Sequence, residues 1–182
     1  MAKLIMWNLM TLDGFVEGPG RDISWFLDVW GEELEQISIA QGKAAGGLLF
    51  GRVTYQLMAN HWPGETGEVA DFMNALPKFV FSRTLTRSDW NNTQVFNADA
   101  AETVARLKRE TAKDILLFGS ADLAGSLIPH RLIDEFRIAV NPLTLGGGTP
   151  LFKSGSERVR LKLLDAKPLT TGAVILRYEP AK

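Results

Sequence analysis

The sequence predicts an α/β fold, in which a mixed sheet flanked by helices ends in a C-terminal antiparallel hairpin. The main observation is that short apolar runs alternate with segments of helical spacing. The same four residues, Leu-Leu-Phe-Gly, also occur at 48–51 and at 116–119, and a helix-like segment follows each copy. Near the end of the chain, apolar runs at 158–165 and 173–178 flank a Thr-Gly pair, which is typical of a hairpin.

The first part of the chain predicts a strand, a loop and two helices. Residues 3–10 form an apolar run of strand length, which breaks into a loop at Asp13-Gly14. From 23 to 45 the apolar spacing is helical but interrupted near Gly31, so we expect a short helix and then a longer one. The N-terminal run is too short to span a bilayer and lacks a small-residue cleavage site, so we expect a cytoplasmic protein.

The middle of the chain continues the alternation. The runs at 48–50 and 114–119 are almost continuously apolar, as expected for strands buried on both faces. Asp99 followed by Glu102 has the spacing of a capping box, which predicts the start of a helix. The remaining patterns predict strands at 78–82, 92–97 and 132–140, and helices at 54–60, 69–76 and 99–111.

Bulk composition excludes several classes of function. The 182 residues suit one domain over residues 1–182. Lys and Arg number 20 against 21 Asp and Glu, so a net charge of −1 provides no overall positive field for nucleic acid or an anionic membrane. The absence of cysteine excludes disulfides, thiolate metal sites and cysteine nucleophiles. The only histidines, His61 and His130, lack a metal-binding spacing, so no metal site is expected.

Each Leu-Leu-Phe-Gly copy predicts a strand that runs into a glycine and then a helix. A helix N-terminus presents free N–H groups and a partial positive charge, and glycine lets an anion approach the backbone closely. Two such junctions could hold two parts of one polyphosphate, although neither carries a P-loop or Rossmann signature. A third strand end carries Ser82 and Arg83, and a bidentate arginine there suits a 2′-phosphate. The alternative is that the glycines only form tight turns and that Arg83 faces solvent.

Six segments in chain order carry a family resemblance: TLDGFVEGPG, LLFGRVTYQ, PKFVFSRTL, LLFGSADLAGSL, LIDEFRIAVNPLTLGGGTPLF and TTGAVILRYEP. Together they resemble the dihydrofolate reductase-like superfamily, and more closely its branch related to the reductase domain of the bifunctional riboflavin-biosynthesis deaminase-reductase. The resemblance covers nearly the whole chain, and the block from Leu132 to Phe152 is its most specific part. It implies a mixed sheet of about eight strands with NADPH lying across the strand ends.

The resemblance also implies which residues would meet NADPH. It places the phosphates of the cofactor at the three strand ends and the nicotinamide near the first loop. The implied cofactor residues are Gly51, Arg52 and Thr54 at the first junction, Gly119, Ser120, Ala121 and Leu123 at the second, Ser82 and Arg83 at the third, and Thr11 and Val16 in or beside the loop.

Hydride transfer also requires a proton, because the reduced nicotinamide supplies only the hydride. Asp22, in Asp-Ile-Ser-Trp-Phe, resembles the acid of the D-x-x-W-F motif at the first helix of dihydrofolate reductases. A helix N-cap explains the same position. Asp13, Phe15 and Trp25 are candidates for the substrate pocket. For Asp13 the alternative is an ordinary Asp-Gly turn, and for Trp25 it is a place in the core.

The implied function is NADPH-dependent hydride transfer to a small heterocycle of the pteridine or aminopyrimidine type. By resemblance the activity is similar to that of 5-amino-6-(5-phosphoribosylamino)uracil reductase. Phe15 stands where riboflavin reductase domains usually carry a basic residue, which favours an apolar or aromatic substrate. The alternative is a non-catalytic NADPH- or metabolite-binding protein of the same fold. The resemblance further implies a homodimer that acts on a small-molecule substrate, with no nucleic-acid or membrane partner.

Overall fold

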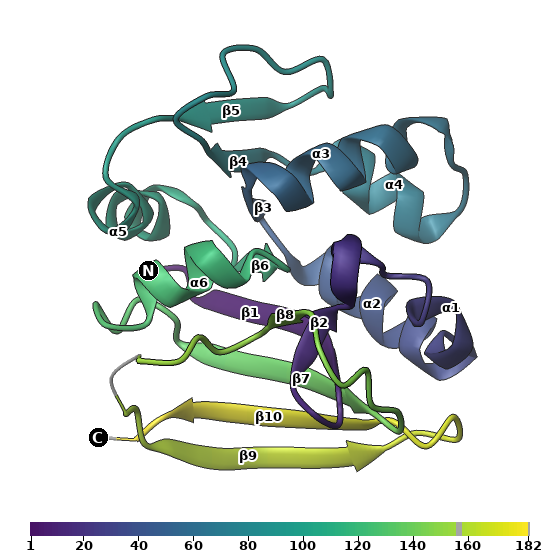
Figure 1. Ribbon diagram of the computed structural model, residues 1–182. Helices are drawn as coiled ribbons and strands as arrows, with labels where there is room; N and C mark the ends of the chain where they lie inside the picture. The colour runs from purple at the N-terminus through teal and green to yellow at the C-terminus, as the bar shows by residue number, and fades with distance from the viewer. Residues whose placement is uncertain (156–157, 182) are drawn as a thin grey trace.

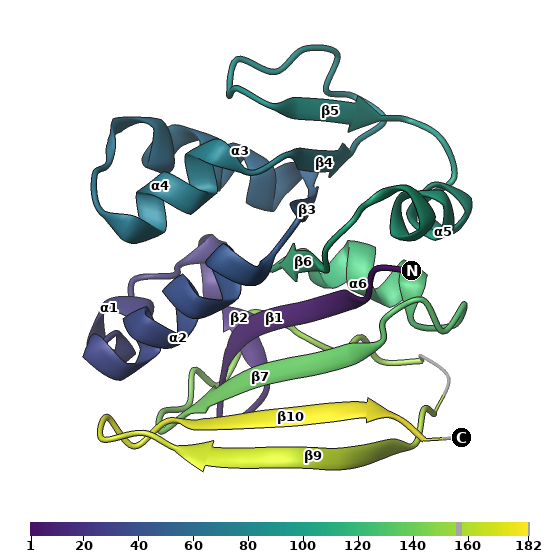
Figure 2. The same ribbon diagram turned by 180° about the vertical axis from the view of Figure 1, so that it is seen from behind.

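The computed structural model describes residues 1–155 and 158–181, and its centre is one eight-stranded sheet (Figures 1 and 2). The strands run in the order β5 (Thr93–Phe96), β4 (Lys78–Phe81), β3 (Gly47–Gly51), β6 (Ile115–Phe118), β1 (Leu4–Thr11), β7 (Glu135–Asn141), β10 (Val174–Pro180) and β9 (Leu161–Pro168). Each neighbouring pair of strands from β5 to β7 is parallel, whereas β10 is antiparallel to both β7 and β9. The predicted mixed sheet with a C-terminal hairpin is therefore confirmed.

A second, two-stranded sheet was not anticipated from the sequence. It pairs β2 (Phe15–Glu17) with β8 (Thr149–Pro150), which brings the first loop against the glycine-rich segment near the end of the chain. Gly148 lies at this contact with a φ of +130°, and a Cβ there would stand 2.0 Å from the carbonyl oxygen of Glu17. Only glycine fits between these two backbones.

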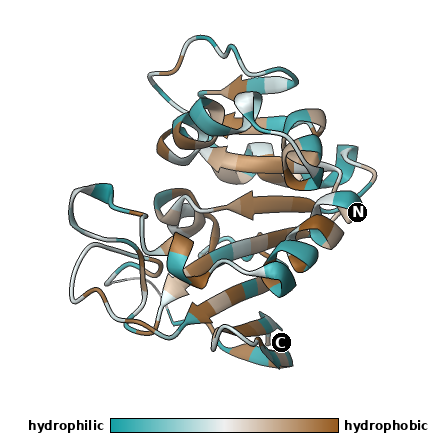
Figure 3. Ribbon diagram, turned by 90° about the vertical axis from the view of Figure 1, so that its right-hand side faces the viewer, coloured by the Kyte–Doolittle hydropathy of each residue, from teal (hydrophilic) through white to brown (hydrophobic). Residues whose placement is uncertain are grey.

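Helices cover both faces of the large sheet, so its central strands are buried on both sides. Figure 3 shows these strands as largely hydrophobic, whereas the helices alternate between hydrophobic and hydrophilic surfaces. One face packs against α5 and α6, and the other against the helices from α2 to α4. The helices are α1 (Phe26–Val29), α2 (Glu32–Ala44), α3 (Arg52–His61), α4 (Glu68–Ala75), α5 (Ala100–Glu110) and α6 (Ala121–Leu127).

Local sequence signals explain several of these boundaries. The side chain of Asp99 accepts a hydrogen bond of 2.9 Å from the backbone N–H of Glu102, so the predicted cap starts α5. The interruption near Gly31 separates α1 from α2, as the spacing indicates. Within residues 1–155 and 158–181, no helix has both the length and the apolarity needed to cross a bilayer.

The two Leu-Leu-Phe-Gly copies lie side by side in the sheet. Strands β3 and β6 are parallel neighbours, and Leu48 pairs with Leu116 while Leu49 pairs with Leu117. Leu48 and Leu116 pack toward α3 and α4, whereas Leu49 and Leu117 pack toward α5 and α6. Because the copies are in register, their glycines end adjacent strands at the same edge of the sheet.

A buried lysine supports the outer part of the sheet. Lys78 at the start of β4 is fully buried, and its Nζ donates hydrogen bonds to the carbonyl oxygens of Asn74 (2.8 Å), Leu76 (2.9 Å) and Asn91 (3.3 Å). The Nζ also lies 4.5 Å from the centroid of the Trp90 ring. Burial lowers the pKa of Lys78 to about 8, because the ammonium has lost its hydration shell.

We expect this lysine to make stability rise with pH above neutrality. In the unfolded chain a lysine keeps its proton up to about pH 10.4, so between about pH 8 and pH 10 the unfolded state binds more protons than the native state. The free energy of unfolding should rise by about 2 kcal/mol over that window, relative to a Lys78→Met variant. Urea unfolding at both ends of the window measures the difference. Equal pH dependence of the two proteins would contradict it, and Lys162→Met, at an exposed lysine, is the control.

Candidate functional site

A large cavity of about 1290 Å³ opens at the carboxyl ends of the central parallel strands. Its walls come from the middle of β1, from the turns after β3, β4 and β6, and from the segment that includes α1. This is the edge at which ligands of α/β sheets collect. The volume exceeds the roughly 300–1,000 Å³ of a pocket for one drug-sized ligand, so there is room for two bound molecules.

Most of the residues predicted for a site line this cavity. Those brought together there are Val16, Trp25, Gly51, Arg52, Thr54, Ser82, Arg83, Gly119, Ser120, Ala121 and Leu123. The predicted residues that do not line it are Thr11, Asp13, Phe15 and Asp22. The first group comes from four separate parts of the chain, which the topology of the sheet places around one opening.

The two glycine junctions are bonded to each other. Ser120 Oγ accepts a hydrogen bond of 2.7 Å from the N–H of Gly51, and Thr54 Oγ1 accepts one of 3.1 Å from the N–H of Ser120. The two hydroxyls are also 3.0 Å apart. The N–H groups of Gly51 and Ser120 therefore hold the two turns together. The backbone N–H groups that could bind an anion are those of the next residues, in the first turns of α3 and α6.

Backbone conformation at the second junction is unusual. Gly119 has a φ of +53° and Ser120 a φ of +56°, so two consecutive residues lie in the left-handed region. A non-glycine residue in this region costs about 1–2 kcal/mol, and Ser120 is held there by its bonds to the first junction. A Cβ on Gly119 would lie 2.9 Å from Cγ2 of Thr54, so the close approach of the turns also requires glycine.

Two exposed guanidinium groups stand at the mouth of the cavity. Arg52 begins α3 and donates to Oε1 of Gln56 at 2.9 Å, whereas Arg83 has no ion-pair partner among the described residues. Ser82 is buried, and its Oγ accepts hydrogen bonds from the N–H groups of Thr84 (3.1 Å) and Leu85 (2.8 Å). Ser82 thus shapes the turn that presents Arg83.

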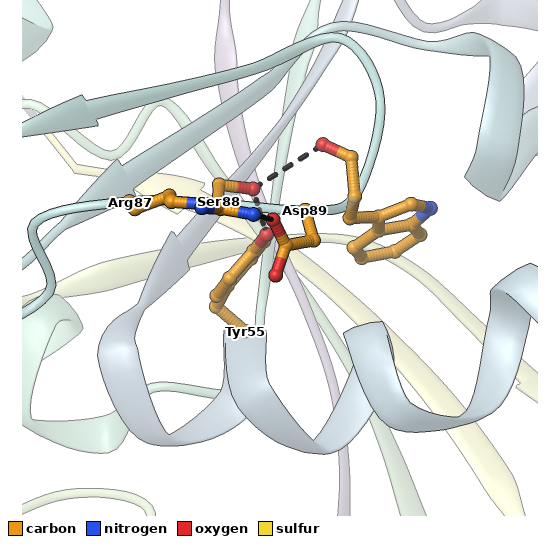
Figure 4. Close-up of polar contacts among 5 residues, drawn as sticks. Tyr55, Arg87, Ser88 and Asp89 are labelled. Atoms are coloured by element: carbon orange, nitrogen blue, oxygen red, sulfur yellow. Dashed lines mark hydrogen bonds and ion pairs between the residues drawn. The ribbon is translucent and has the colours of Figure 1, made fainter.

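The loop that follows Arg83 is anchored to α3. Figure 4 shows the hydroxyls of Tyr55 and Ser88 in contact, and Ser88 Oγ also donates to the carbonyl oxygen of Trp90 at 3.2 Å. Arg87 and Asp89 form an exposed ion pair on the same loop. The ring of Trp90 packs against those of Phe50 and Tyr55. These contacts fix the loop relative to the first glycine junction.

Asp13 connects the first loop to the glycine-rich segment. Its carboxylate accepts hydrogen bonds from the Thr11 hydroxyl (2.5 Å) and from the N–H groups of Leu145 (3.1 Å) and Gly146 (2.8 Å). The Thr11 hydroxyl and these amides lower the pKa of Asp13 below its ordinary value. Thr11 is fully buried and also accepts from the N–H of Phe15 at 3.0 Å. Thr11, Asp13 and Phe15 therefore shape the loop that carries Val16 to the cavity.

Asp22 is exposed, and its carboxylate turns toward its own loop. Its Oδ1 accepts a hydrogen bond of 2.9 Å from the N–H of Ser24, shortly before α1 begins. The backbone and side chain of Ser24 lower the pKa of Asp22 below its ordinary value. The N-cap of α1 is Trp25, which has no side-chain cap hydrogen bond, so Asp22 closes a local turn before the helix and does not cap it. A catalytic role for Asp22 stays a prediction.

Other lining residues were missed from the sequence. Asn8 is a polar residue in the middle of the apolar first strand, which is the signal that could have found it. It is buried, and its Nδ2 has no hydrogen-bond partner among the described residues. The same holds for the indole N–H of Trp25. Buried donors without partners are rare in folded proteins, and here both belong to residues of one cavity. Trp7, Arg21 and Trp30 line it as well.

Comparisons with known sequences agree with this architecture. The chain matches the model of the RibD C-terminal domain family over residues 2–175. It is 32% identical over 185 residues to the uncharacterized protein YyaP of Bacillus subtilis (strain 168), covering 97% of this chain and 94% of that protein. It is also 27% identical over 176 residues to the uncharacterized protein YwjB of the same organism, covering 97% of each.

Solved structures share the fold. A putative riboflavin biosynthesis protein from Shewanella sp. PV-4 has a TM-score of 0.81 at 20% identity, over 100% of both chains. A deaminase and 5-amino-6-(5-phosphoribosylamino)uracil reductase from Thermotoga maritima has a TM-score of 0.71 at 13% identity, over 99% of this chain and 57% of that one. Dihydrofolate reductase from Enterococcus faecalis, in complex with NADP(H) and RAB-propyl, has a TM-score of 0.68 at 13% identity, over 99% and 97%. The dihydrofolate reductase-like fold is confirmed, and the chain belongs to the RibD C-terminal domain family.

Proposed function

We propose that this protein is an NADPH-dependent reductase that transfers hydride to a small heterocycle of the pteridine or aminopyrimidine type. Family membership supports a reductase-like domain of the riboflavin-biosynthesis type. A relative in fold was solved with NADP(H), which supports a nicotinamide cofactor. The observation that carries the proposal is the single cavity in which two glycine junctions and two guanidinium groups converge beside an aromatic wall.

The residues of the junctions fit a dinucleotide. The starts of α3 and α6 present backbone N–H groups and partial positive charge to a diphosphate. Arg52 and Arg83 are placed to form charge-assisted hydrogen bonds with a further phosphate, such as the 2′-phosphate that distinguishes NADPH from NADH. Val16 and Leu123 supply apolar contacts.

The other part of the cavity suits a flat substrate. Trp7, Trp25 and Trp30 provide aromatic surface, and the unpartnered donor of Trp25 would be satisfied by an acceptor on a heterocycle. Phe15 does not line the cavity, so its apolar character does not bear directly on the substrate. Arg21 does line it and supplies a cation. A phosphorylated substrate, as in 5-amino-6-(5-phosphoribosylamino)uracil reductase activity, therefore remains within the proposal.

Reduced nicotinamide would supply the hydride, and the residues of this chain would position the reactants and limit water. Orientation of two bound molecules in one cavity removes much of the entropic cost of bringing them together. Asp22 does not line this cavity, and we assign no proton donor among the titratable residues that do line it, which are Glu17, Glu35, His61, Glu68 and Asp122. Solvent that enters at the open mouth of the cavity is the source that we propose.

This assignment makes a prediction for Asp22. We expect Asp22→Asn to change turnover by less than about two-fold, since proton transfer by a positioned acid is usually worth about 100-fold or more. We expect Asp22→Ala to lower the melting temperature, because the acceptor for the N–H of Ser24 is lost. A hundred-fold fall in turnover for Asp22→Asn, with NADPH affinity retained, would instead establish Asp22 as the acid or its relay.

The lack of an assigned donor also favours a second candidate function, a non-catalytic NADPH- or metabolite-binding protein. One pair of measurements tests both. Isothermal titration calorimetry with NADPH should give binding, and NADPH oxidation should then be followed with a panel of pteridines and aminopyrimidines. Binding with no oxidation of NADPH by any member of the panel would favour the second function. No binding at millimolar NADPH would exclude the reductase and the NADPH-binding form of the second function, and would leave only a metabolite-binding protein.

We also propose that the protein forms a homodimer through the C-terminal hairpin. Every residue of the edge strand β9 is exposed, including Leu161, Leu163 and Leu164 at 37%, 52% and 41%. An open strand edge with apolar side chains favours pairing with a second chain. Light scattering should give twice the mass of one chain, and Leu163→Glu should give the monomer. A monomeric native protein would exclude the dimer.

A further inference from the structure

A second, smaller cavity of about 330 Å³ lies between α2 and the C-terminal part of the sheet. Its lining residues belong to α2 and to the strands β1, β7, β9 and β10. Figure 2 shows α2 in front of the sheet and no helix over β9 and β10. Trp7 lines both this cavity and the large one, so one residue borders both. The remaining lining residues are Ile37, Ala40, Gln41, Ala44, Arg137, Asp165, Lys167, Ile175 and Arg177.

Two arginines in this cavity are held by one buried carboxylate. Glu135 Oε1 accepts hydrogen bonds from Nε of Arg137 (2.7 Å) and from Nε of Arg177 (2.9 Å), and Nη2 of Arg177 forms an ion pair with the same oxygen at 2.9 Å. Burial alone would raise the pKa of Glu135, but the bonds and charges of both arginines outweigh it and leave that pKa below its ordinary value. The carboxylate is thus ionised, and it fixes both guanidinium groups in place.

Gln41 on α2 completes the donor set. Its Oε1 accepts a hydrogen bond of 2.9 Å from Nη1 of Arg137, which fixes the orientation of the side-chain amide. The other end of the amide, the Nε2 donor, is buried and has no hydrogen-bond partner among the described residues. Gln41 is only 8% exposed and lines the cavity, so water reaches this donor poorly.

We infer that this second cavity is a binding site for a small organic anion with one carboxylate and a flat apolar body. Gln41 Nε2 lacks an acceptor, and the guanidinium N–H groups that do not bond to Glu135 or Gln41 are further donors for an anion. Lys167 adds a positive charge, whereas Asp165 at the rim opposes a ligand of higher negative charge. Trp7, Ile37 and Ile175 provide apolar walls that inorganic phosphate would leave uncovered.

Benzoate is the probe that tests this inference, with the full-length protein and without NADPH. In a ¹H–¹⁵N NMR titration, the side-chain amide resonances of Gln41 and the indole resonance of Trp7 should shift and saturate. Benzyl alcohol, which has the ring but no charge, should cause no saturable shift, and inorganic phosphate should bind at least ten-fold more weakly than benzoate.

Gln41→Leu should weaken benzoate binding by about ten-fold or more, because a hydrogen bond to a charged group is lost. Lys167→Gln, at an exposed residue, gives a second variant that should also weaken binding if the first does not fold. Lys162→Gln on the same strand is the matched control and should leave the affinity unchanged. The inference is overturned if native protein shows no saturable shift up to about 10 mM benzoate. It is also overturned if the resonances of Trp25 move while those of Gln41 do not, or if phosphate binds as tightly as benzoate.

Discussion

Gly119→Ala should weaken NADPH binding by about 10- to 100-fold and lower the free energy of unfolding by about 1–3 kcal/mol. An alanine at a φ of +53° is strained by its own Cβ. That Cβ would also lie 2.9 Å from Cγ2 and 3.0 Å from Oγ1 of Thr54, so the two junctions would have to move apart. The hydrogen bonds between Ser120 and the first junction would lengthen with that movement. Calorimetry with NADPH and urea unfolding measure the two losses.

A matched variant separates strain from crowding. Gly20 has a φ of +71°, but a Cβ there would have no heavy atom within 4 Å. We therefore expect Gly20→Ala to lower the free energy of unfolding only by the cost of placing an alanine at a positive φ, and to leave NADPH affinity unchanged. Adding Thr54→Ser to Gly119→Ala removes Cγ2 while keeping the hydroxyl, and it should restore part of the affinity. If Gly119→Ala binds NADPH as the native protein does, the junctions do not form the cofactor site.

Arg52→Ala and Arg83→Ala should each weaken NADPH binding by about 10- to 150-fold, with much less effect on NADH. A hydrogen bond to a charged group is worth about 1.5–3 kcal/mol, and only NADPH carries the 2′-phosphate. Both guanidinium groups line the large cavity, and Arg83 has no competing carboxylate partner among the described residues. Titration of each variant with NADPH and with NADH gives the ratio of the two dissociation constants, which should fall toward one in both variants.

Arg87→Ala is the control for this pair of variants. Arg87 lies on the same loop as Arg83 but forms an ion pair with Asp89 and does not line the cavity. We expect it to bind both cofactors as the native protein does. Equal losses for NADPH and NADH in Arg52→Ala or Arg83→Ala would mean that the arginine meets the shared diphosphate or serves only the fold.

The fold could be predicted from local signals because most of its elements carry them. Continuous apolar runs marked the buried strands, the Asp99 cap marked the start of α5, and the final apolar pair marked the hairpin. The small sheet of β2 and β8 escaped prediction because its strands are very short and pair across more than 130 residues of sequence. No window of sequence contains that pairing.

The candidate site could be predicted only in part, for a similar reason. Residue types at the strand ends pointed to Arg52, Arg83 and the junction glycines, all of which line the cavity. Nothing local indicated that Ser120 and Thr54 bond to each other, because they are 66 residues apart. Asp13 was selected for its chemistry, but its carboxylate is engaged by the backbone of a distant loop. Local patterns identify which groups are available, and long-range contacts decide which of them face a ligand.

The in-register pairing of the two Leu-Leu-Phe-Gly segments has a consequence for biogenesis. One of the two glycine junctions that we propose for the cofactor phosphates is made before residue 60 and the other after residue 115, so a nascent chain has only one of them until β6 has emerged and inserted between β3 and β1. Cofactor should therefore associate only after the central sheet has closed, and it would then stabilise the finished molecule without rescuing earlier intermediates.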